Sequence, residues 1–149
     1  ADEGDVATGD GLEVLVVEDH PVNRMILEAW MASTGQRTSM AENGLEAVEA
    51  ARDQRFDLII MDVNMPVMDG LAATRLIREG GEVNAETPIV VLSASARMED
   101  HEAGLAAGAD AYLNKPIDFR SLSALMVHAQ GGRAALRRLA EQDNEAAAA

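Results

Sequence analysis

Acidic residues follow two of the apolar segments of this 149-residue chain. The run Val14–Val17 leads directly into Glu18 and Asp19, and the run Leu58–Met61 leads into Asp62. Short apolar runs of this kind are typical of strands that are buried on both faces of a parallel sheet. Because ligand sites of open α/β sheets lie beyond the carboxyl ends of the strands, we expect the three carboxylates to meet at one edge.

A hydroxyl group and an amine follow two further apolar segments. Ile89–Leu92 ends at Ser93, and the segment that starts at Asp110 leads to Lys115. Strands of the same parallel sheet would bring all of these polar side chains to one edge. Three carboxylates, a hydroxyl and an amine can together bind a divalent cation and hold a phosphoryl group.

The acidic residues have the chemistry of a magnesium site. Mg²⁺ prefers hard oxygen ligands and usually keeps some of its waters, and Asp19 and Asp62 can each supply one carboxylate oxygen. Clustered carboxylates repel one another without a cation, so we expect the metal to be required. Adjacent acids such as Glu18 and Asp19 also occur as ordinary loop charges, but their register with Asp62 and Lys115 favours the metal site.

Asp62 is the predicted nucleophile. A carboxylate can accept a phosphoryl group and form an acyl phosphate. This transfer requires in-line geometry and neutralisation of the phosphoryl oxygens, which Mg²⁺ and the ammonium group of Lys115 can provide. An Asp after a strand can also cap a helix or a turn. The Met-Pro and Met-Asp-Gly sequence that follows argues against that alternative.

Several separate motifs cover most of the chain. They are Val17-Glu18-Asp19, Met61-Asp62-Val63-Asn64-Met65-Pro66, Met68-Asp69-Gly70, Leu92-Ser93-Ala94, Gly108-Ala109-Asp110 and Lys115-Pro116. Through them the sequence resembles the receiver domain of bacterial two-component response regulators, over about residues 12–130. A set of motifs in order is far more specific than one short pattern. The Met61–Gly70 segment, with Asn23-Arg24 after the acidic pair, looks most like receivers attached to hybrid histidine kinases.

The resemblance implies how the metal and the phosphoryl group are held. Asp62 would accept the phosphoryl group from a phosphohistidine. Mg²⁺ would bind Asp19, Asp62 and the backbone carbonyl of Asn64, with Glu18 acting through a water or an indirect contact. Lys115 would neutralise the phosphoryl oxygens, and its bond to Pro116 is expected to be a cis peptide.

The resemblance also implies a conformational switch. The hydroxyl of Ser93 and the backbone N–H of Ala94 would donate hydrogen bonds to the phosphoryl group. Phosphorylation would draw Ser93 toward Asp62, and Tyr112 would move inward to fill the space. The catalytic set is therefore Asp62, Lys115 and Ser93, and the switch set is Ser93, Ala94 and Tyr112.

The expected function is that of a phosphoacceptor receiver domain in a two-component phosphorelay. Its partner would be a histidine kinase or a histidine phosphotransfer protein. A homodimer, or an intramolecular contact with a kinase domain, would use the Met98–Ala129 face. The domain would phosphorylate and dephosphorylate itself without turning over small substrates, and the parent of a hybrid receiver would be a kinase.

Two other functions use similar residues. Magnesium-dependent phosphatases of the haloacid dehalogenase type also form an aspartyl phosphate, but the Asp nucleophile of those enzymes lies in a motif similar to Asp-x-Asp-x-Thr. Here Asn64 lies two residues after Asp62, and no Thr follows it. A pseudo-receiver that serves only for docking is the second alternative, and the intact set of Asp19, Asp62, Ser93 and Lys115 argues against it.

Composition excludes several classes of protein. A formal net charge of −14 disfavours binding to nucleic acids and to anionic membranes. The absence of cysteine excludes disulfides and thiolate chemistry. No apolar stretch approaches the ~20 residues of a membrane span, and the acidic residues 1–11 lack the apolar core of a signal peptide. We therefore expect no membrane contact by this chain and a cytoplasmic location.

The remaining pattern predicts an α/β fold. Five strand–helix units imply a doubly wound, five-stranded parallel sheet with five flanking helices, and the resemblance implies the flavodoxin-like order 2-1-3-4-5. Predicted boundaries are a linker at 1–11, the receiver domain at 12–130 and a C-terminal tail at 131–149 with a short helix at about 133–142.

Apolar spacing also predicts which helical faces are buried. In the first helix the expected inward face is Val22, Met25, Ile26, Ala29 and Trp30. In the second helix it is Leu45 and Val48. In the last helix of the domain it is Phe119, Leu122, Leu125, Met126 and Ala129. Arg133, Arg137 and Arg138 are expected to form a solvated basic stripe in the tail.

Overall fold

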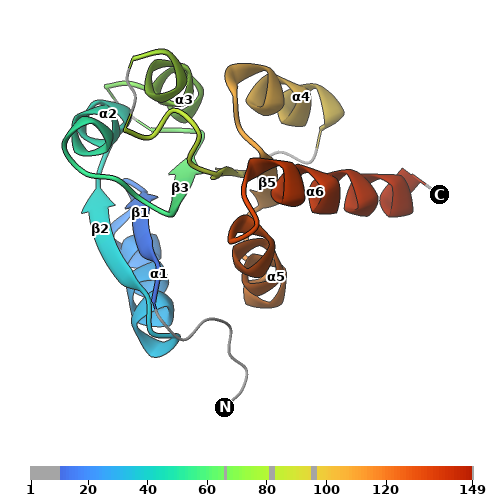
Figure 1. The fold of residues 1–149 in the computed structure, drawn as a ribbon, viewed down its shortest axis with the longest axis horizontal. Helices are drawn as coiled ribbons and strands as arrows, with labels where there is room; N and C mark the ends of the chain where they lie inside the picture. Colours follow the sequence, from blue (N-terminus) through green and yellow to red (C-terminus); the bar gives the residue numbers. More distant parts are fainter. Residues whose placement is uncertain (1–10, 66, 81–82, 95–96, 149) are drawn as a thin grey trace.

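The computed structural model describes residues 11–65, 67–80, 83–94 and 97–148, with side chains up to residue 141 (Figure 1). Most of the predicted 1–11 linker lies outside the described residues, as do Pro66 and Gly81. The strands are β1 Glu13–Val17, β2 Arg37–Ala41, β3 Leu58–Asp62, β4 Ile89–Ser93 and β5 Ala111–Asn114. The helices are α1 Pro21–Ser33, α2 Gly44–Asp53, α3 Gly70–Glu79, α4 Met98–Ala107, α5 Phe119–Ala129 and α6 Arg133–Ala148.

The strands form one parallel sheet in the order β2-β1-β3-β4-β5, which confirms the predicted fold class. Val17 of β1 pairs with Met61 of β3, so Glu18 and Asp62 leave the sheet at the same level. Asp62 in turn pairs with Leu92 of β4, next to Ser93. The register therefore brings the polar residues at the strand ends to one edge.

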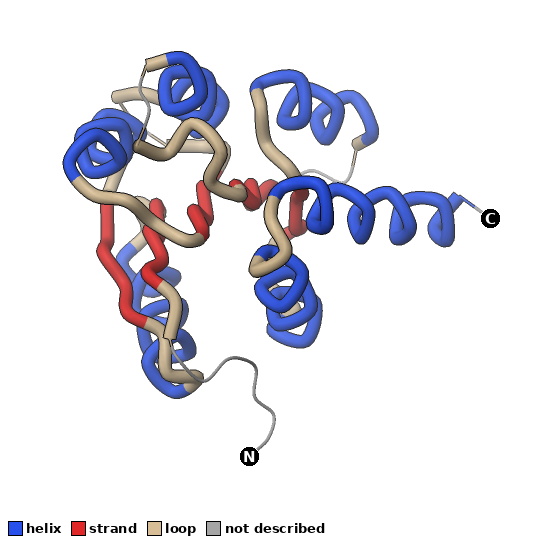
Figure 2. Tube along the Cα trace, viewed as in Figure 1, coloured by secondary structure: helices blue, strands red, loops and turns tan. Residues whose placement is uncertain are grey.

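Helices lie on both sides of the sheet (Figure 2). Alternate residues of each strand enter two apolar layers, one on each face of the sheet. Val14 and Val16 belong to the layer that α1, α5 and α6 cover, whereas Leu15 and Val17 belong to the layer that α2 and α3 cover. Both faces of the central strands are therefore apolar, which explains why these strands read as unbroken hydrophobic runs.

The inward face of α1 differs from the prediction. Leu27 and Met31 are fully buried, whereas Val22, Met25 and Ile26 are 49%, 63% and 45% exposed. The helix carries two apolar stripes, and the sheet can cover only one of them. Leu45 of α2 is likewise exposed, although Val48 is buried as predicted. The predicted inward face of α5 is confirmed.

Besides the five predicted flanking helices, the described chain has the helix expected in the tail, α6, which is longer than predicted and folds onto the domain. Leu136 of α6 is fully buried in the same apolar layer as α1 and α5. The expected solvated stripe is confirmed for Arg137 and Arg138, which are exposed, and is wrong for Arg133, which is partly buried. Arg133 and Arg137 both donate hydrogen bonds to Asp110. The domain boundaries at 1–11, 12–130 and 131–149 stay predictions.

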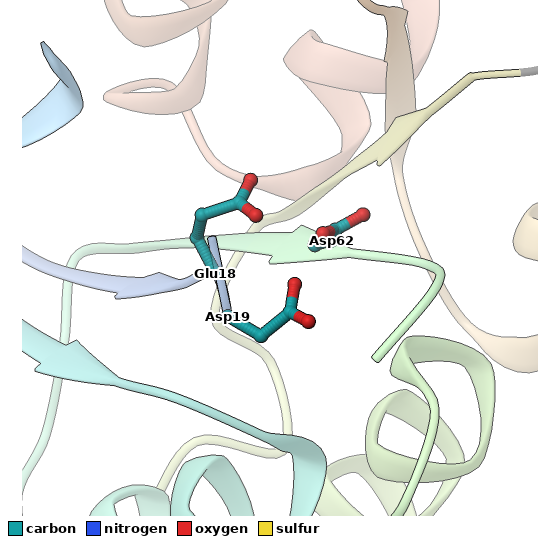
Figure 3. Close-up of side chains that lie close together, drawn as sticks. All are labelled: Glu18, Asp19 and Asp62. Carbon is teal, nitrogen blue, oxygen red and sulfur yellow. The ribbon is translucent and has the colours of Figure 1, made fainter. Parts of the chain in front are cut away.

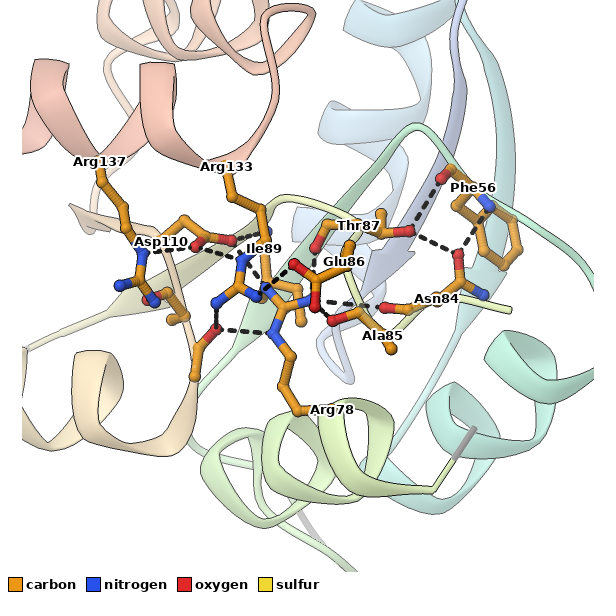
Figure 4. A network of polar contacts seen from close by, with 12 residues as sticks. Phe56, Arg78, Asn84, Ala85, Glu86, Thr87, Ile89, Asp110, Arg133 and Arg137 are labelled. Carbon is orange, nitrogen blue, oxygen red and sulfur yellow. Dashed lines mark hydrogen bonds and ion pairs between the residues drawn. The ribbon is translucent and has the colours of Figure 1, made fainter. Parts of the chain in front are cut away.

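Asp110 is the centre of a polar network beneath β5 (Figure 4). It is fully buried and accepts from Nη2 of Arg78 at 2.7 Å, from Nε of Arg133 and Arg137 at 2.8 Å each, and from the backbone N–H of Ile89 at 3.0 Å. Burial, partly opposed by Asp110, lowers the pKa of Arg78 to about 10. One carboxylate thus connects α3, α6, β4 and the start of β5.

None of the helices in the described part of the chain is both long enough and apolar enough to cross a lipid bilayer.

Asp110→Asn should lower the free energy of unfolding by about 3 kcal/mol, because it removes the charge that compensates buried guanidinium groups. Urea denaturation measures this loss. Glu86→Gln is the matched control, since Glu86 pairs with Arg133 at 3.1 Å but its side chain is 84% exposed. The control should cost less than about 1 kcal/mol. Losses of equal size would show that Asp110 does not anchor the network.

Candidate functional site

Three carboxylates converge at the carboxyl edge of the sheet (Figure 3). Glu18 and Asp19 follow β1, and Asp62 is the last residue of β3. Each side chain offers one oxygen that lies within 4.8 Å of the other two. Glu18 and Asp62 are buried, and Asp19 is partly exposed. The predicted acidic cluster is therefore present, with Asp19 on its open side.

Lys115 reaches this cluster from the segment after β5. Its Nζ lies 3.0 Å from Oδ2 of Asp62 and 3.4 Å from Oε1 of Glu18. The backbone N–H of Lys115 donates to the carbonyl of Ser93 at 2.8 Å, which fixes the lysine beside the end of β4. The Lys115–Pro116 bond is cis, as predicted.

Close backbone packing holds the loop that follows Asp62. Gly70 donates its N–H to the carbonyl of Val63 at 2.9 Å. A Cβ atom at Gly70 would lie 2.1 Å from the carbonyl oxygen of Asp62, closer than any side chain tolerates. The glycine of the Met-Asp-Gly motif thus lets α3 begin directly against the backbone of Asp62. Asn64 donates its N–H to Oδ1 of Asp62 at 3.3 Å.

The charges of the site shift the pKa values of two groups. Burial raises the pKa of Glu18, the charge of Asp62 raises it further, and the N–H of His20 opposes this. Burial alone would lower the pKa of Lys115, but its hydrogen bond and charge contacts with Asp62 and Glu18 outweigh burial and raise it. The lysine is therefore cationic, and the carboxylates still exceed it in charge.

The donor set fits a magnesium ion. Among the buried side-chain polar atoms of the described residues, Oε1 of Glu18 has no hydrogen-bond partner. Its Oε2 accepts from the N–H of His20 at 3.1 Å. Hard carboxylate oxygens with one unsatisfied position are the ligands that Mg²⁺ takes, directly or through water. Asp19, Asp62, the carbonyl of Asn64 and, less directly, Glu18 are the residues that would hold it.

The predicted switch residues lie next to the site rather than within the acidic cluster. Ser93 is buried at the end of β4 and pairs with Asn114 of β5, whereas Ala94 is exposed. Tyr112 is half-buried and stacks on His101 of α4, with ring centroids 3.6 Å apart. Sequence reasoning gave His101 no specific role, because nothing in its local sequence shows that it faces β5.

The comparisons with known proteins decide the family. A sequence profile described as response regulator receiver domain matches residues 14–127. The chain belongs to this receiver family. It is 44% identical over 113 residues to hybrid signal transduction histidine kinase G of Dictyostelium discoideum. This match covers 74% of the chain. The chain spans only 3% of that relative's length.

Two solved receiver structures are similar in both sequence and fold. The receiver domain of sensor histidine kinase PA1611 from Pseudomonas aeruginosa, solved with a magnesium ion in its active-site cleft, is 40% identical with a TM-score of 0.75. The match covers 81% of this chain and 98% of that one. The receiver domain of Ssk1 from Saccharomyces cerevisiae, in complex with the histidine phosphotransfer protein Ypd1, is 31% identical with a TM-score of 0.73. That match covers 79% and 88% of the two chains.

Glu18→Gln should stabilise the metal-free receiver. Burial raises the pKa of Glu18, which means that its ionised form is less favourable in the folded chain than in the unfolded chain. The folded chain keeps the proton at pH values where the unfolded chain has lost it. Metal-free wild type should therefore lose stability from about pH 4.5 upward, and the variant should lose less. Thermal unfolding in chelator measures both effects.

The same variant should respond less to magnesium, since Glu18 contributes to the oxygen-rich site. Glu28→Gln, at an exposed position of α1, is the matched control and should behave as wild type in chelator and in magnesium. A Glu18→Gln protein that is less stable than wild type in chelator would contradict the electrostatic account of the site.

Proposed function

We propose that this receiver accepts a phosphoryl group on Asp62 from a phosphohistidine in a two-component phosphorelay. The observation that carries this proposal is the position of Asp62, which ends β3 with Nζ of Lys115 at 3.0 Å and two further acids beside it. A carboxylate oxygen of Asp62 attacks phosphorus, and a P–O bond forms. The P–N bond breaks, and its electron pair stays on the donor imidazole.

The residues of the site divide the work of this transfer. Magnesium, when bound, neutralises charge on the phosphoryl oxygens. Asp19, Asp62 and the carbonyl of Asn64 would hold that ion, and Glu18 would contribute less directly. Lys115 moves from Asp62 toward the phosphoryl group as charge develops there. The PA1611 receiver, solved with a magnesium ion in its active-site cleft, supports a magnesium ion at this site.

The proposed switch uses Ser93, Ala94 and Tyr112. The hydroxyl of Ser93 and the N–H of Ala94 donate to the phosphoryl group, and Tyr112 responds by moving inward. The burial of Ser93 beside β3 and the partial burial of Tyr112 support this proposal. Self-dephosphorylation through the same site, without turnover of small substrates, and a cytoplasmic location also remain proposals. The phosphatase and pseudo-receiver alternatives predict no stable aspartyl phosphate.

Asp62→Asn should abolish phosphorylation, because the amide cannot form the acyl phosphate. Wild type with acetyl phosphate and Mg²⁺ should gain one base-labile phosphoryl group by intact-mass spectrometry. Asp19→Ala should slow labelling at subsaturating Mg²⁺ while the far-UV circular dichroism stays unchanged. Labelling of the Asp62→Asn protein on another side chain would sink the mechanism.

An exposed apolar surface beside the site suits the phosphodonor protein. Val22, Met25 and Ile26 of α1 are exposed. Next to them lies a cavity of about 200 Å³ lined by Asn23, Ile26, Lys115, Pro116, Ile117 and Phe119. We therefore place the histidine kinase or phosphotransfer protein on this α1 surface, rather than on the Met98–Ala129 face. The partner needs an apolar helical surface that presents its phosphohistidine next to Lys115. The Ssk1–Ypd1 complex supports a partner of this class.

Met25→Glu should slow phosphotransfer from a histidine phosphotransfer domain about tenfold or more, since burying a Met side chain contributes roughly 1.5–3 kcal/mol. Labelling by acetyl phosphate should be unchanged, because this donor needs no docking surface. Leu76→Glu on α3 is the matched control, with an exposed apolar residue on the other face of the sheet. Equal slowing in both variants would place the docking surface elsewhere.

A further inference from the structure

Helix α6 begins beside β5 and α5 and then extends outward from the domain (Figure 1). Its N-terminal half covers part of the face formed by α4, β5 and α5. Leu136 is fully buried in the apolar layer that contains Leu122 and Leu125 of α5. Leu139 and Ala140 pack against the same layer. This face is the one that the sequence suggested for a homodimer or a kinase contact. In the described chain its occupant is the protein's own α6.

The polar anchor of α6 is attached to the strand that carries Tyr112. Arg133 and Arg137 both donate to Oδ1 of Asp110 at 2.8 Å (Figure 4). Asp110 immediately precedes β5, and Tyr112 follows two residues later. A change at Tyr112 is therefore close to the anchor in both sequence and space.

Tyr112 also lines the space between α4 and α6. A cavity of about 110 Å³ is bounded by Leu105 of α4, by Asp110 and Tyr112, and by Arg137, Ala140 and Glu141 of α6. Elsewhere on its ring Tyr112 stacks on His101, whose Nε2 lies 3.1 Å from Oδ1 of Asn114. Tyr112 therefore contacts α4 through His101 and forms part of the wall that faces α6.

We propose that α6 is an intramolecular ligand of the α4–β5–α5 face and that the position of Tyr112 determines how tightly it docks. The inference rests on the proposed phosphorylation of Asp62. When Tyr112 moves inward, it leaves the wall of the cavity beside Ala140 and Arg137. The cavity beneath α6 then becomes larger, its surface fits α6 less closely, and α6 detaches. A second copy of the domain can reach this face only after that step.

Coupling between two sites is reciprocal, so the effect of α6 docking on phosphoryl binding at Asp62 can also be measured. If phosphorylation weakens α6 docking, then weaker docking must favour the phosphorylated conformation by the same factor. Arg137→Ala removes one contact to Asp110 while Arg78 and Arg133 remain. It should therefore tighten the binding of beryllofluoride, a phosphoryl mimic, about fivefold. Arg138→Ala, at the exposed neighbouring position, is the matched control and should leave binding unchanged.

Amide hydrogen exchange of residues 133–141 reports α6 docking directly. Beryllofluoride with Mg²⁺ should speed exchange in this segment about tenfold in wild type and leave β1 unchanged. Tyr112→Ala should speed amide exchange of residues 133–141 without any ligand, whereas Arg138→Ala should leave this exchange unchanged. The inference would be overturned if α6 exchange stays unchanged in wild type that mass spectrometry shows to be phosphorylated on Asp62. It would also be overturned if α6 exchange in Tyr112→Ala is as slow as in unphosphorylated wild type.

The design separates the two proposals. Failure of Asp62 to take a phosphoryl group would sink the proposed function. The comparison of Tyr112→Ala with Arg138→Ala needs no phosphorylation, so it still supports or overturns the contact between Tyr112 and α6.

Discussion

The site depends on two carboxylates, Glu18 and Asp62, that are buried side by side at the end of an apolar sheet. Burial of charge is costly unless the charge is compensated. Nζ of Lys115 lies 3.0 Å from Asp62 and 3.4 Å from Glu18, but its single positive charge can balance only one of the two carboxylates. Asp19 adds a third negative group. The surplus of negative charge makes the site receptive to a divalent cation. The raised pKa of Glu18 is the cost of this arrangement in the metal-free protein.

Backbone geometry determines where that charge can lie. Both faces of β1 and β3 are apolar, so the charged residues have room only beyond the carboxyl ends of the strands. The loop after Asp62 must then return at once into α3. Gly70 permits this return because its lack of Cβ leaves room for the carbonyl of Asp62. The same close approach limits how far the backbone of Asp62 can move.

The five strand–helix units and the acidic cluster could be predicted from local patterns, because the carboxyl ends of parallel strands meet at one edge of a sheet. The strand order was predicted only through the resemblance to receiver domains. The sequence did not predict which apolar stripe of α1 would be buried, because the choice between Leu27 with Met31 and Val22 with Met25 depends on how the helix crosses the sheet. It also missed the packing of α6. The partners of Asp110 lie 23 and 27 residues away, and nothing in the local pattern of Arg133 and Arg137 identifies a buried acceptor. The role of Tyr112 beside His101 likewise required contacts between separate elements.

Strand β5 connects the two charged clusters of the domain. Asp110 precedes it and Lys115 follows it, so a strand of four residues spans roughly 13 Å between them. At one end a single carboxylate compensates several guanidinium groups, and at the other a single lysine compensates several carboxylates. Both clusters are tied to the same short strand, and Tyr112 lies between them. Under the proposed phosphorylation of Asp62, a rearrangement of Lys115 would act on a strand whose other end holds α6 through Asp110. Strand β5 is then the physical connection between the site and the face that α6 covers.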